Sequence, residues 1–371
     1  MNLNRIKALV IKEFHQIKRD PSSFLIALIF PIMLLFLYGY GVSLDLTHLK
    51  VGLFLQDESS ESLSFASSLK NSQFFSIYSS QDESELKSML TSGKIHGIIV
   101  VPFYFHQKYQ QKDAAPIFVI ADGESPNTAS FVQNYVEGAW MNWMIQMNLE
   151  NENNKSQAAV LEPRFWFNPQ LSSHYFLIPG SIAIIMTLVG TLLTALVVAR
   201  EWERGTMEAL LATPVTTHEL LLSKMISYFV LGILSFLFCF FVSIFLFEVP
   251  FRGSISFLML AASFFLITAL SGGLFISTVT KDQFIASQIA IMSSFLPAYS
   301  LSGFIFEVTS MPILIQIISN FIPAKYFVSS LQTLYLAGDV KSLVFSNIFS
   351  LFLLAMIPIS LVLKKFKKRI N

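Results

Sequence analysis

Long stretches of the chain carry no charged residue, and their lengths predict how the chain meets a membrane. Six such stretches hold between 22 and 35 consecutive uncharged positions. A helix needs about 20 apolar residues to cross the hydrocarbon core of a bilayer, so each stretch can supply one transmembrane helix. The predicted spans are residues 21–44, residues 173–199, three helices within residues 225–306, and residues 342–363.

A seventh uncharged stretch, residues 308–324, is shorter than the others. It has 17 positions, and Pro312 and Pro323, which interrupt helices, bracket it. Backbone that leaves a helix cannot face lipid. Residues 307–341 are therefore expected to form an extracytoplasmic re-entrant or interfacial hairpin held against the other helices. A seventh full span is the alternative interpretation.

Residues 45–172 form the one long polar segment, and their pattern alternates between strand and helix. This alternation predicts a small α/β domain with a mainly parallel sheet. Trp140, Trp143 and Trp166 are expected to anchor its end at the membrane interface. Strands are predicted at residues 50–56, 74–78, 95–101 and 117–121, and helices at residues 59–70, 82–92, 103–111 and 125–159.

The composition is that of a membrane protein. Of 371 residues, 53% are hydrophobic and 13% are charged, which is about half the charge of a soluble domain. This excludes a disordered chain, a nucleic-acid binder with a broad basic face and an ordinary soluble enzyme. The single cysteine, Cys239, excludes an internal disulfide and a cysteine-based metal site. The expected fold class is an α-helical polytopic membrane protein with six transmembrane helices, a hairpin and an inserted extracytoplasmic α/β domain.

Lysine and arginine set the expected orientation. Five lie within the N-terminal segment, residues 1–20, and five within the basic tail, residues 364–371. Both termini are therefore expected in the cytoplasm of a cell with a bacterial inner membrane. The loop of residues 200–224 is then cytoplasmic, and the polar segment 45–172, with a net charge of −6, lies outside. The first span is too long for a signal peptide and is expected to stay as an anchor.

The spans lack the groups that many transport and catalytic mechanisms need. None of the six contains Asp, Glu, Lys or Arg, which argues against an ion-coupled carrier. No nucleotide-binding loop, metal-ligand spacing or nucleophile motif occurs in the sequence. No catalytic residue, metal or cofactor is therefore assigned to this chain, and any ATP hydrolysis must occur in another polypeptide.

The predicted cytoplasmic loop begins with the densest mixed charge of the chain. Gly205 breaks the preceding helix, and Thr206 can cap a new helix over residues 207–212. A further short helix, residues 217–223, leads into the third span. The loop is either a helix lying on the membrane surface or a coupling element that seats in a groove of a partner. Its charged start includes Arg200 and Glu201, its polar side holds Glu203, Arg204 and Glu208, and its apolar side holds Met207, Leu210 and Leu211, before Pro214.

The chain resembles the membrane subunits of type-2 ABC transporters, in the subgroup with a large outer domain between the first two spans. This subgroup includes bacterial multidrug-type permeases that work with a separate ATPase. The loop is the most specific part of the resemblance. The similar stretches are Lys12, Glu13, Phe14, Arg19, Asp20 and Pro21 with Pro31, residues 93–102 with 121–123, residues 200–214, and residues 320–326.

The resemblance implies a permease subunit of an exporter. Two permease chains would pair, as a homodimer or with a related second permease, above two ATPase subunits that bind ATP and Mg. The helix around residues 204–211 would dock into the ATPase. The amphipathic helix of residues 2–19 would lie at the inner surface and touch the ATPase as well. Membrane lipid is the other expected partner, and Gram-negative members can add a periplasmic adaptor and an outer-membrane channel. Nucleic acid is not an expected partner.

Two other classes of function are weighed against this one. A membrane-anchored sensor with an outer ligand-binding domain would need a cytoplasmic output domain, and a membrane enzyme would need clustered acid–base or metal residues. The spans also contain small and hydroxyl-bearing residues, which either allow close helix packing or line a path for an amphipathic or lipid-like substrate. These residues are Gly190, Thr191, Thr194, Ser271, Gly272, Gly273, Ser293, Ser294 and Ser300.

Overall fold

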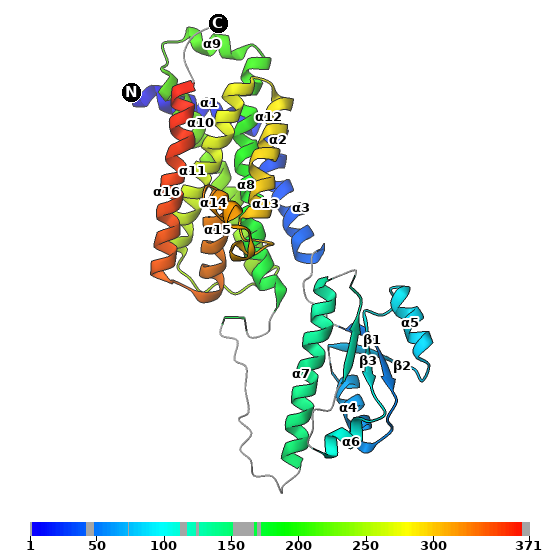
Figure 1. The fold of residues 1–371 in the computed structure, drawn as a ribbon. Helices are drawn as coiled ribbons and strands as arrows, with labels where there is room; N and C mark the ends of the chain where they lie inside the picture. Colours follow the sequence, from blue (N-terminus) through cyan, green and yellow to red (C-terminus); the bar gives the residue numbers. More distant parts are fainter. Residues whose placement is uncertain are drawn as a thin grey trace. The chain divides into compact units, whose positions relative to one another are not determined.

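The chain divides into two compact units. One is made of Met1–Ser43 with Phe165–Asn371 and is helical, and the other is Leu44–Arg164 and contains a sheet (Figure 1). The predicted fold class, a polytopic helical membrane protein with an inserted α/β domain, is confirmed. The computed structural model describes residues 2–41, 48–72, 74–111, 117–123, 126–150, 167–168 and 172–365.

Among these residues, six helices are long and apolar enough to cross a membrane, as the sequence predicts. The second of them lies inside the bundle, because 94% of its most apolar stretch is buried against its neighbours. A helix that is apolar on all sides is expected in such a place. The spans are Pro21–Gly41, which contains α2 (Pro21–Phe24) and α3 (Phe30–Phe36), α8 (Ser173–Glu203), α10 (Thr217–Phe245), α11 (Ile255–Thr280), Gln283–Leu301, which contains α12 (Gln283–Ala290) and α13 (Leu296–Leu301), and α16 (Lys341–Lys365).

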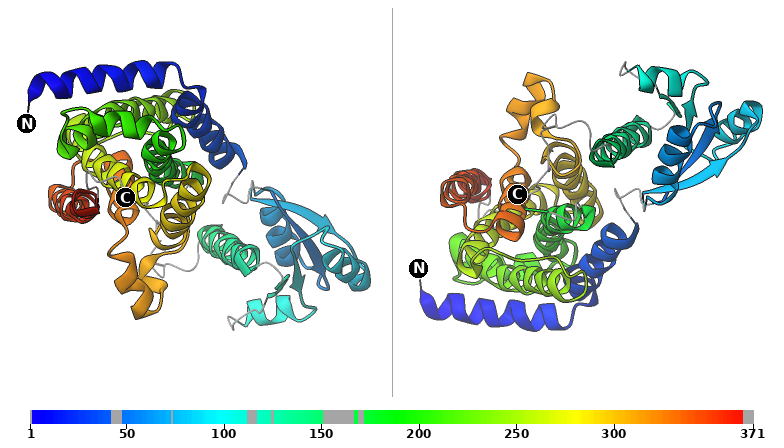
Figure 2. Two further views of the ribbon diagram at one scale, coloured as in Figure 1. Left: turned by 90° about the horizontal axis from the view of Figure 1, so that it is seen from above. Right: turned by 90° about the horizontal axis from the view of Figure 1, so that it is seen from below.

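The N-terminal helix, α1 (Leu3–Lys18), runs across one end of this bundle rather than along it (Figure 2). It buries Ile6 and Glu13, which lie two turns apart on one face. The chain then turns at Asp20, whose carboxylate accepts the backbone N–H of Ser23 and so caps α2. Pro21 occupies the first turn of α2, where a missing N–H has no cost.

Residues 307–341 contain a sharply bent pair of helices. α14 (Ile313–Ser319) and the segment Pro323–Ala337, which begins as α15 (Pro323–Gln332), are bent by 83°. Pro323 cannot donate a backbone hydrogen bond to the preceding turn, so the first helix ends before it and a second begins. The bend has the geometry of a re-entrant hairpin or of a broken seventh span, the two forms that the sequence allows.

The second unit is a four-stranded sheet with helices. Its strand order is β2-β1-β3-β4, with β1 parallel to β2 and to β3, and β4 antiparallel to β3. The mainly parallel sheet predicted from the sequence is confirmed. The elements are β1 (Leu49–Leu55), α4 (Ser60–Lys70), β2 (Phe75–Ser79), α5 (Glu83–Thr91), β3 (Gly97–Val101), α6 (Phe105–Gln110), β4 (Phe118–Ala121) and α7 (Pro126–Glu150).

Two of the three tryptophans expected at the membrane interface lie in the core of this unit instead. Trp143 is 2% exposed, and its indole N–H donates to Ser64 Oγ at 3.1 Å. Trp140 packs edge-on against Phe65 and Phe105. Both side chains therefore hold α7 against the rest of the α/β unit, because burying an aromatic ring there removes more apolar surface from water than an interfacial position would. Trp166 lies outside the described residues.

Candidate functional site

The predicted coupling residues and the N-terminal helix meet at one end of the helical unit. There α1 packs against α10, and α9 (Thr206–Ala212) follows the end of α8 (Figure 1). Polar and charged side chains from these elements, far apart in the sequence, contact one another directly. The site is therefore described from its buried contacts outward.

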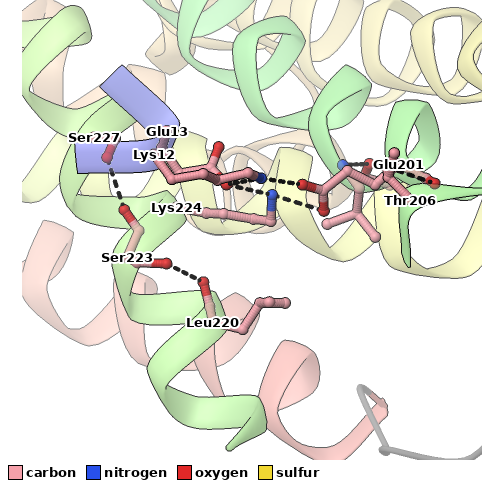
Figure 3. Close-up of polar contacts among 10 residues, drawn as sticks. Lys12, Glu13, Glu201, Thr206, Leu220, Ser223, Lys224 and Ser227 are labelled. Carbon is pink, nitrogen blue, oxygen red and sulfur yellow. Dashed lines mark hydrogen bonds and ion pairs between the residues drawn. The ribbon is translucent and has the colours of Figure 1, made fainter. Parts of the chain in front are cut away.

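Four charged side chains form a cluster, here called the charged joint: Lys12 and Glu13 of α1, Glu201 of α8 and Lys224 of α10 (Figure 3). Lys224 Nζ lies 3.0 Å from Glu13 Oε1 and 2.8 Å from Glu201 Oε2. Lys12 Nζ lies 2.9 Å from Glu13 Oε1 and 2.8 Å from Glu201 Oε1. Each lysine bridges the same two carboxylates, so the joint connects three helices.

Because the charged joint is buried, its stability depends on every one of its charges. The side chain of Lys224 is 0% exposed, and those of Glu13 and Glu201 are each 2% exposed. Removing an ion from water costs several kcal/mol, a cost that only close partners of opposite charge offset. Burial by itself would lower the pKa of Lys12, but Glu201 and Glu13 outweigh it and raise this pKa. Each buried carboxylate therefore has two lysines within 3.0 Å.

A second ion pair connects the start of the first span to the end of α8. The guanidinium of Arg200 pairs with Asp20, and it also donates to Ser22 Oγ at 3.0 Å and to Gln283 Oε1 at 3.2 Å. Gln283 is the first residue of α12. One largely buried arginine therefore links the first, second and fifth apolar helices at the same end of the bundle.

This pair predicts a pH effect. Partial burial pulls the pKa of Asp20 upward, but hydrogen bonds from Ser23, Arg200 and Ser22 outweigh it and lower the pKa to about 2. A carboxyl whose pKa is lower in the folded state stabilises the fold above its ordinary value of 3.8, and this contribution is lost as the pH falls toward 2. We expect Asp20→Asn to lower the thermal midpoint at pH 7 and the difference from the unaltered protein to shrink toward pH 2.

Thermal unfolding of both purified proteins in detergent, followed from pH 7 to pH 2, measures this difference. If the thermal midpoints of the two proteins converge in the acid range, the ion pair stabilises the folded protein as inferred. A difference that stays constant across the range would mean that the charge of Asp20 is not what stabilises this end of the bundle.

The first residues of α1 contact the far end of the loop. The backbone N–H of Asn2 donates to Glu219 Oε1 at 2.7 Å, and Arg5 Nη1 donates to the carbonyl oxygen of Pro214 at 2.7 Å. Glu219 also closes a capping box with Thr216 at the start of α10. α1 is therefore attached to the loop as well as to the spans.

The loop differs in two ways from its predicted helices. Gly205, not Thr206, is the N-cap residue of α9, with a φ of 68°, a left-handed conformation that glycine adopts without strain. The Thr206 hydroxyl instead donates to the carbonyl oxygen of Glu201 at 3.3 Å. The expected short helix of residues 217–223 is the first part of α10, because the capping box starts one continuous helix.

The apolar side of the loop faces its own bundle. Met207 is 1% exposed and packs in a cluster with Val198, Leu220 and Leu274. Leu210 packs against the edge of the same cluster and is half-buried. Met207 therefore stabilises the loop on the bundle and offers little surface to a partner, because the bundle already covers it. The side chain of Leu211 lies outside the described residues.

The residues singled out in the sequence differ in how far they are exposed. The buried ones join the helices to one another, and the half-buried and exposed ones can meet a partner. Glu203 is exposed but accepts hydrogen bonds from Gln283, including one from its backbone N–H at 2.6 Å. The buried residues are Glu13, Arg200, Glu201 and Met207, the half-buried residues are Lys12, Asp20 and Leu210, and the exposed residues are Phe14, Arg19, Pro21, Glu203, Arg204, Gly205, Thr206, Glu208 and Pro214.

A groove of about 400 Å³ lies between α1 and α9. Its charged residues are three cations, Lys12, Arg200 and Arg204, and one anion, Glu201, and Leu210 contributes an apolar wall. The excess of positive charge suits a segment that carries acidic side chains beside an apolar one. Gln16, Thr206, Ala209 and Thr213 complete the lining.

The site also contains residues that no motif in the sequence indicates, among them Lys224 and Gln283. Lys224 does carry a signal, because it lies two turns inside a long apolar helix, and a lone lysine there needs a buried partner. In the part of the chain that the structure describes, no group of three or more His, Cys, Asp or Glu residues is arranged to hold a metal ion.

Known proteins resemble this chain along nearly its whole length. The sequence model of one family, described as "ABC-2 family transporter protein", matches residues 22–364. The chain is 46% identical over 372 residues to the Escherichia coli (strain K12) protein named "Probable multidrug ABC transporter permease YbhS", covering 100% of this chain and 99% of that protein. It is 25% identical over 369 residues to YbhR of the same strain, covering 99% of each. It is 22% identical to the "Linearmycin resistance permease protein LnrN" of Bacillus subtilis, covering 91% of this chain and 92% of that protein.

Proposed function

The chain belongs to the ABC-2 family of transporter permeases, and from this premise we propose that it forms the membrane path of an exporter driven by a separate ATPase through residues 200–214. The charged joint is the observation that carries the proposal. It connects α1, α8 and α10 at the end of the bundle from which α9 projects. A force applied to α1 or α9 would therefore move two spans together.

The exposed residues of this end supply a docking surface for the ATPase. Arg204 caps the end of α8, Glu208 lies in α9, and both are exposed. The groove between α1 and α9 is lined by Arg204. The ATPase would bind and hydrolyse ATP with Mg, and its contacts with this surface would differ between nucleotide states, as any coupled conformational change requires. Met207 contributes by holding α9 on the bundle rather than by binding the partner.

The assembly and the location follow from the same family. A second permease copy, either this chain or a related one, would complete the path across the inner membrane. The α/β unit would lie outside and both termini in the cytoplasm, as the lysine and arginine distribution favours. The relatives named as multidrug permeases support drug efflux as the transport reaction. The cargo would be an amphipathic compound, and a periplasmic adaptor and an outer-membrane channel would be further partners.

Exchanging the charges of Arg204 and Glu208 tests the docking surface. We expect the double variant Arg204→Glu, Glu208→Arg to retain about tenfold less ATPase on purification from membranes, because opposite charges that meet the partner become like charges. The exchange keeps the net charge of this end of the chain, because one residue gains the charge that the other loses. ATPase retained on the affinity-tagged permease is the quantity to measure, together with growth of a deletion strain on toxic amphipathic compounds.

A matched control exists in the α/β unit. Glu83 and Lys87 are also four residues apart on an exposed helix, with their charged atoms 2.8 Å apart. The same exchange there, Glu83→Lys with Lys87→Glu, is expected to leave both ATPase retention and growth unchanged. If the Arg204 and Glu208 exchange retains the ATPase as well as this control does, the proposed docking surface is wrong.

A further inference from the structure

A cavity of about 280 Å³ lies within the helical unit, away from the charged joint. Its walls come from α8, α11, the Gln283–Leu301 span, α16 and the break between α14 and α15. Thr191 and Thr268, which line it, lie near the midpoints of α8 and α11. The volume is close to the lower limit of pockets that hold small molecules, about 300 Å³.

The cavity has a polar wall without charge. Five hydroxyl side chains line it, and none of the residues around it in the described part of the chain is Asp, Glu, Lys, Arg or His. An ion placed there would lose its hydration without a countercharge, which costs several kcal/mol. The cavity therefore favours an uncharged occupant. The five residues are Thr187, Thr191, Thr268, Ser293 and Ser294.

Each of these hydroxyls donates its hydrogen to a backbone carbonyl of its own helix. Thr187 donates to the carbonyl oxygen of Ala183, and Thr268 donates to that of Phe264, each at 2.8 Å. Thr191, Ser293 and Ser294 donate in the same way to the carbonyl four residues earlier. A hydroxyl has one hydrogen and two lone pairs, so each oxygen is left as an acceptor.

Proline adds acceptors to the same wall. Pro358 interrupts α16 and has no N–H to donate to the carbonyl of Leu354, and both residues line the cavity. Pro297 stands in the same relation to Ser293, beside a π-helical turn at Ile291–Phe295. The wall thus offers oxygen atoms and needs hydrogen-bond donors from outside the protein.

From this geometry we infer that the cavity binds an uncharged amphiphile whose head carries hydroxyl or amide donors. The head would donate to the oxygens of the five hydroxyl residues, and its apolar part would pack on Phe265, Phe321 and the prolines that line the same space. The inference rests on the proposed function only in making this occupant a cargo of the permease. The binding itself requires no ATPase.

Gly272 offers a way to close the cavity. It lines the space, and a Cβ atom added there meets nothing within 4 Å, so a larger side chain enters the void without striking a helix. Gly272→Leu therefore fills the cavity. Gly138, on the exposed surface of α7, has equally open surroundings, and Gly138→Leu is the matched control.

The test uses the purified permease alone, in phosphatidylcholine vesicles, with two photoreactive probes. One is a diazirine-bearing long-chain alcohol, and the other is the same alkyl chain without the hydroxyl. We expect the alcohol to label peptides around Thr268 and Ser294 about three- to tenfold more than the alkane does, the factor that one hydrogen bond provides. Gly272→Leu should abolish this labelling, and Gly138→Leu should leave it unchanged.

A second variant distinguishes loss of binding from misfolding. Thr268→Val keeps the shape of the side chain but removes the acceptor, so labelling by the alcohol should fall while labelling by the alkane stays. The inference is overturned if the alkane labels these peptides as strongly as the alcohol, or if Gly272→Leu does not reduce labelling while its thermal midpoint is unchanged. Because no ATPase is present, failure here is distinct from failure of the coupling proposal.

Discussion

Replacing Lys224 with methionine is expected to lower the free energy of unfolding by about 3–5 kcal/mol, because it leaves Glu13 and Glu201 buried without one of their two cations. The methionine side chain fits a similar volume, so packing changes little. Lys12 remains, but it is partly exposed and cannot neutralise both carboxylates. The thermal midpoint of the purified protein, followed by tryptophan fluorescence, measures the loss.

Two further variants serve as controls for this result. Lys87→Met removes a lysine whose side chain is 59% exposed, and it is expected to change stability by less than about 0.5 kcal/mol. The triple variant Lys224→Met, Glu13→Gln, Glu201→Gln removes the buried charges together and should recover most of the loss. If Lys224→Met is as stable as Lys87→Met, the charged joint does not contribute to the free energy of unfolding.

The second large effect concerns two adjacent glycines of α11. A Cβ atom added at Gly273 would lie 2.1 Å from the carbonyl oxygen of Thr191 and 2.4 Å from Thr194 Oγ1. The first of these atoms belongs to the backbone of α8, so the two helices would have to separate. We expect Gly273→Ala to destabilise the protein by about 3 kcal/mol, at the upper end of the usual cost of overpacking.

Gly272→Ala provides the neighbouring control. It adds the same methyl group one residue earlier, where nothing lies within 4 Å, and it should be neutral or stabilising by up to about 1 kcal/mol because alanine favours helix over glycine. Thermal midpoints and the yield of folded protein from membranes compare the two. Equal behaviour of the two variants would contradict the close approach of α8 and α11.

The sequence allows two roles for the small residues in the spans, close helix packing and lining a path. The structure shows which residues pack closely. Gly190 and Gly273 serve close packing, since an added Cβ atom at either would lie within 3.0 Å of the facing helix. Thr194 serves packing as well, because its hydroxyl lies 2.7 Å from the carbonyl oxygen of Leu270. Thr191, Gly272, Ser293 and Ser294 line the cavity. Some of the small and hydroxyl-bearing residues of the spans therefore hold helices together, and others line a space between helices.

The charged joint also bears on how force would travel. Surface ion pairs contribute little to stability, whereas a buried cluster is strong only when it is complete. A joint of this kind resists small displacements and fails as a unit, which suits a connection between a helix outside the bundle and two spans within it. Under the proposed coupling to an ATPase, Lys224→Met is therefore also expected to separate ATP hydrolysis from transport.

The six spans, the inserted α/β unit and the N-terminal amphipathic helix were determined by the sequence alone. The reason is physical: a hydrocarbon core demands about 20 apolar residues for each crossing, and strands and helices impose different periods on their apolar residues. Each of these features depends on residues that are close together in the chain.

Only the tertiary structure decided which charges are buried and with what. Glu13, Glu201 and Lys224 are separated by 188 and 23 positions in the sequence, so no local pattern predicts that they meet. Whether Met207 faces a partner or its own bundle, and whether Gly273 or Gly272 touches α8, depends on how the helices are rotated and how closely they approach. Those choices follow from packing between distant segments, which a pattern along one chain does not contain.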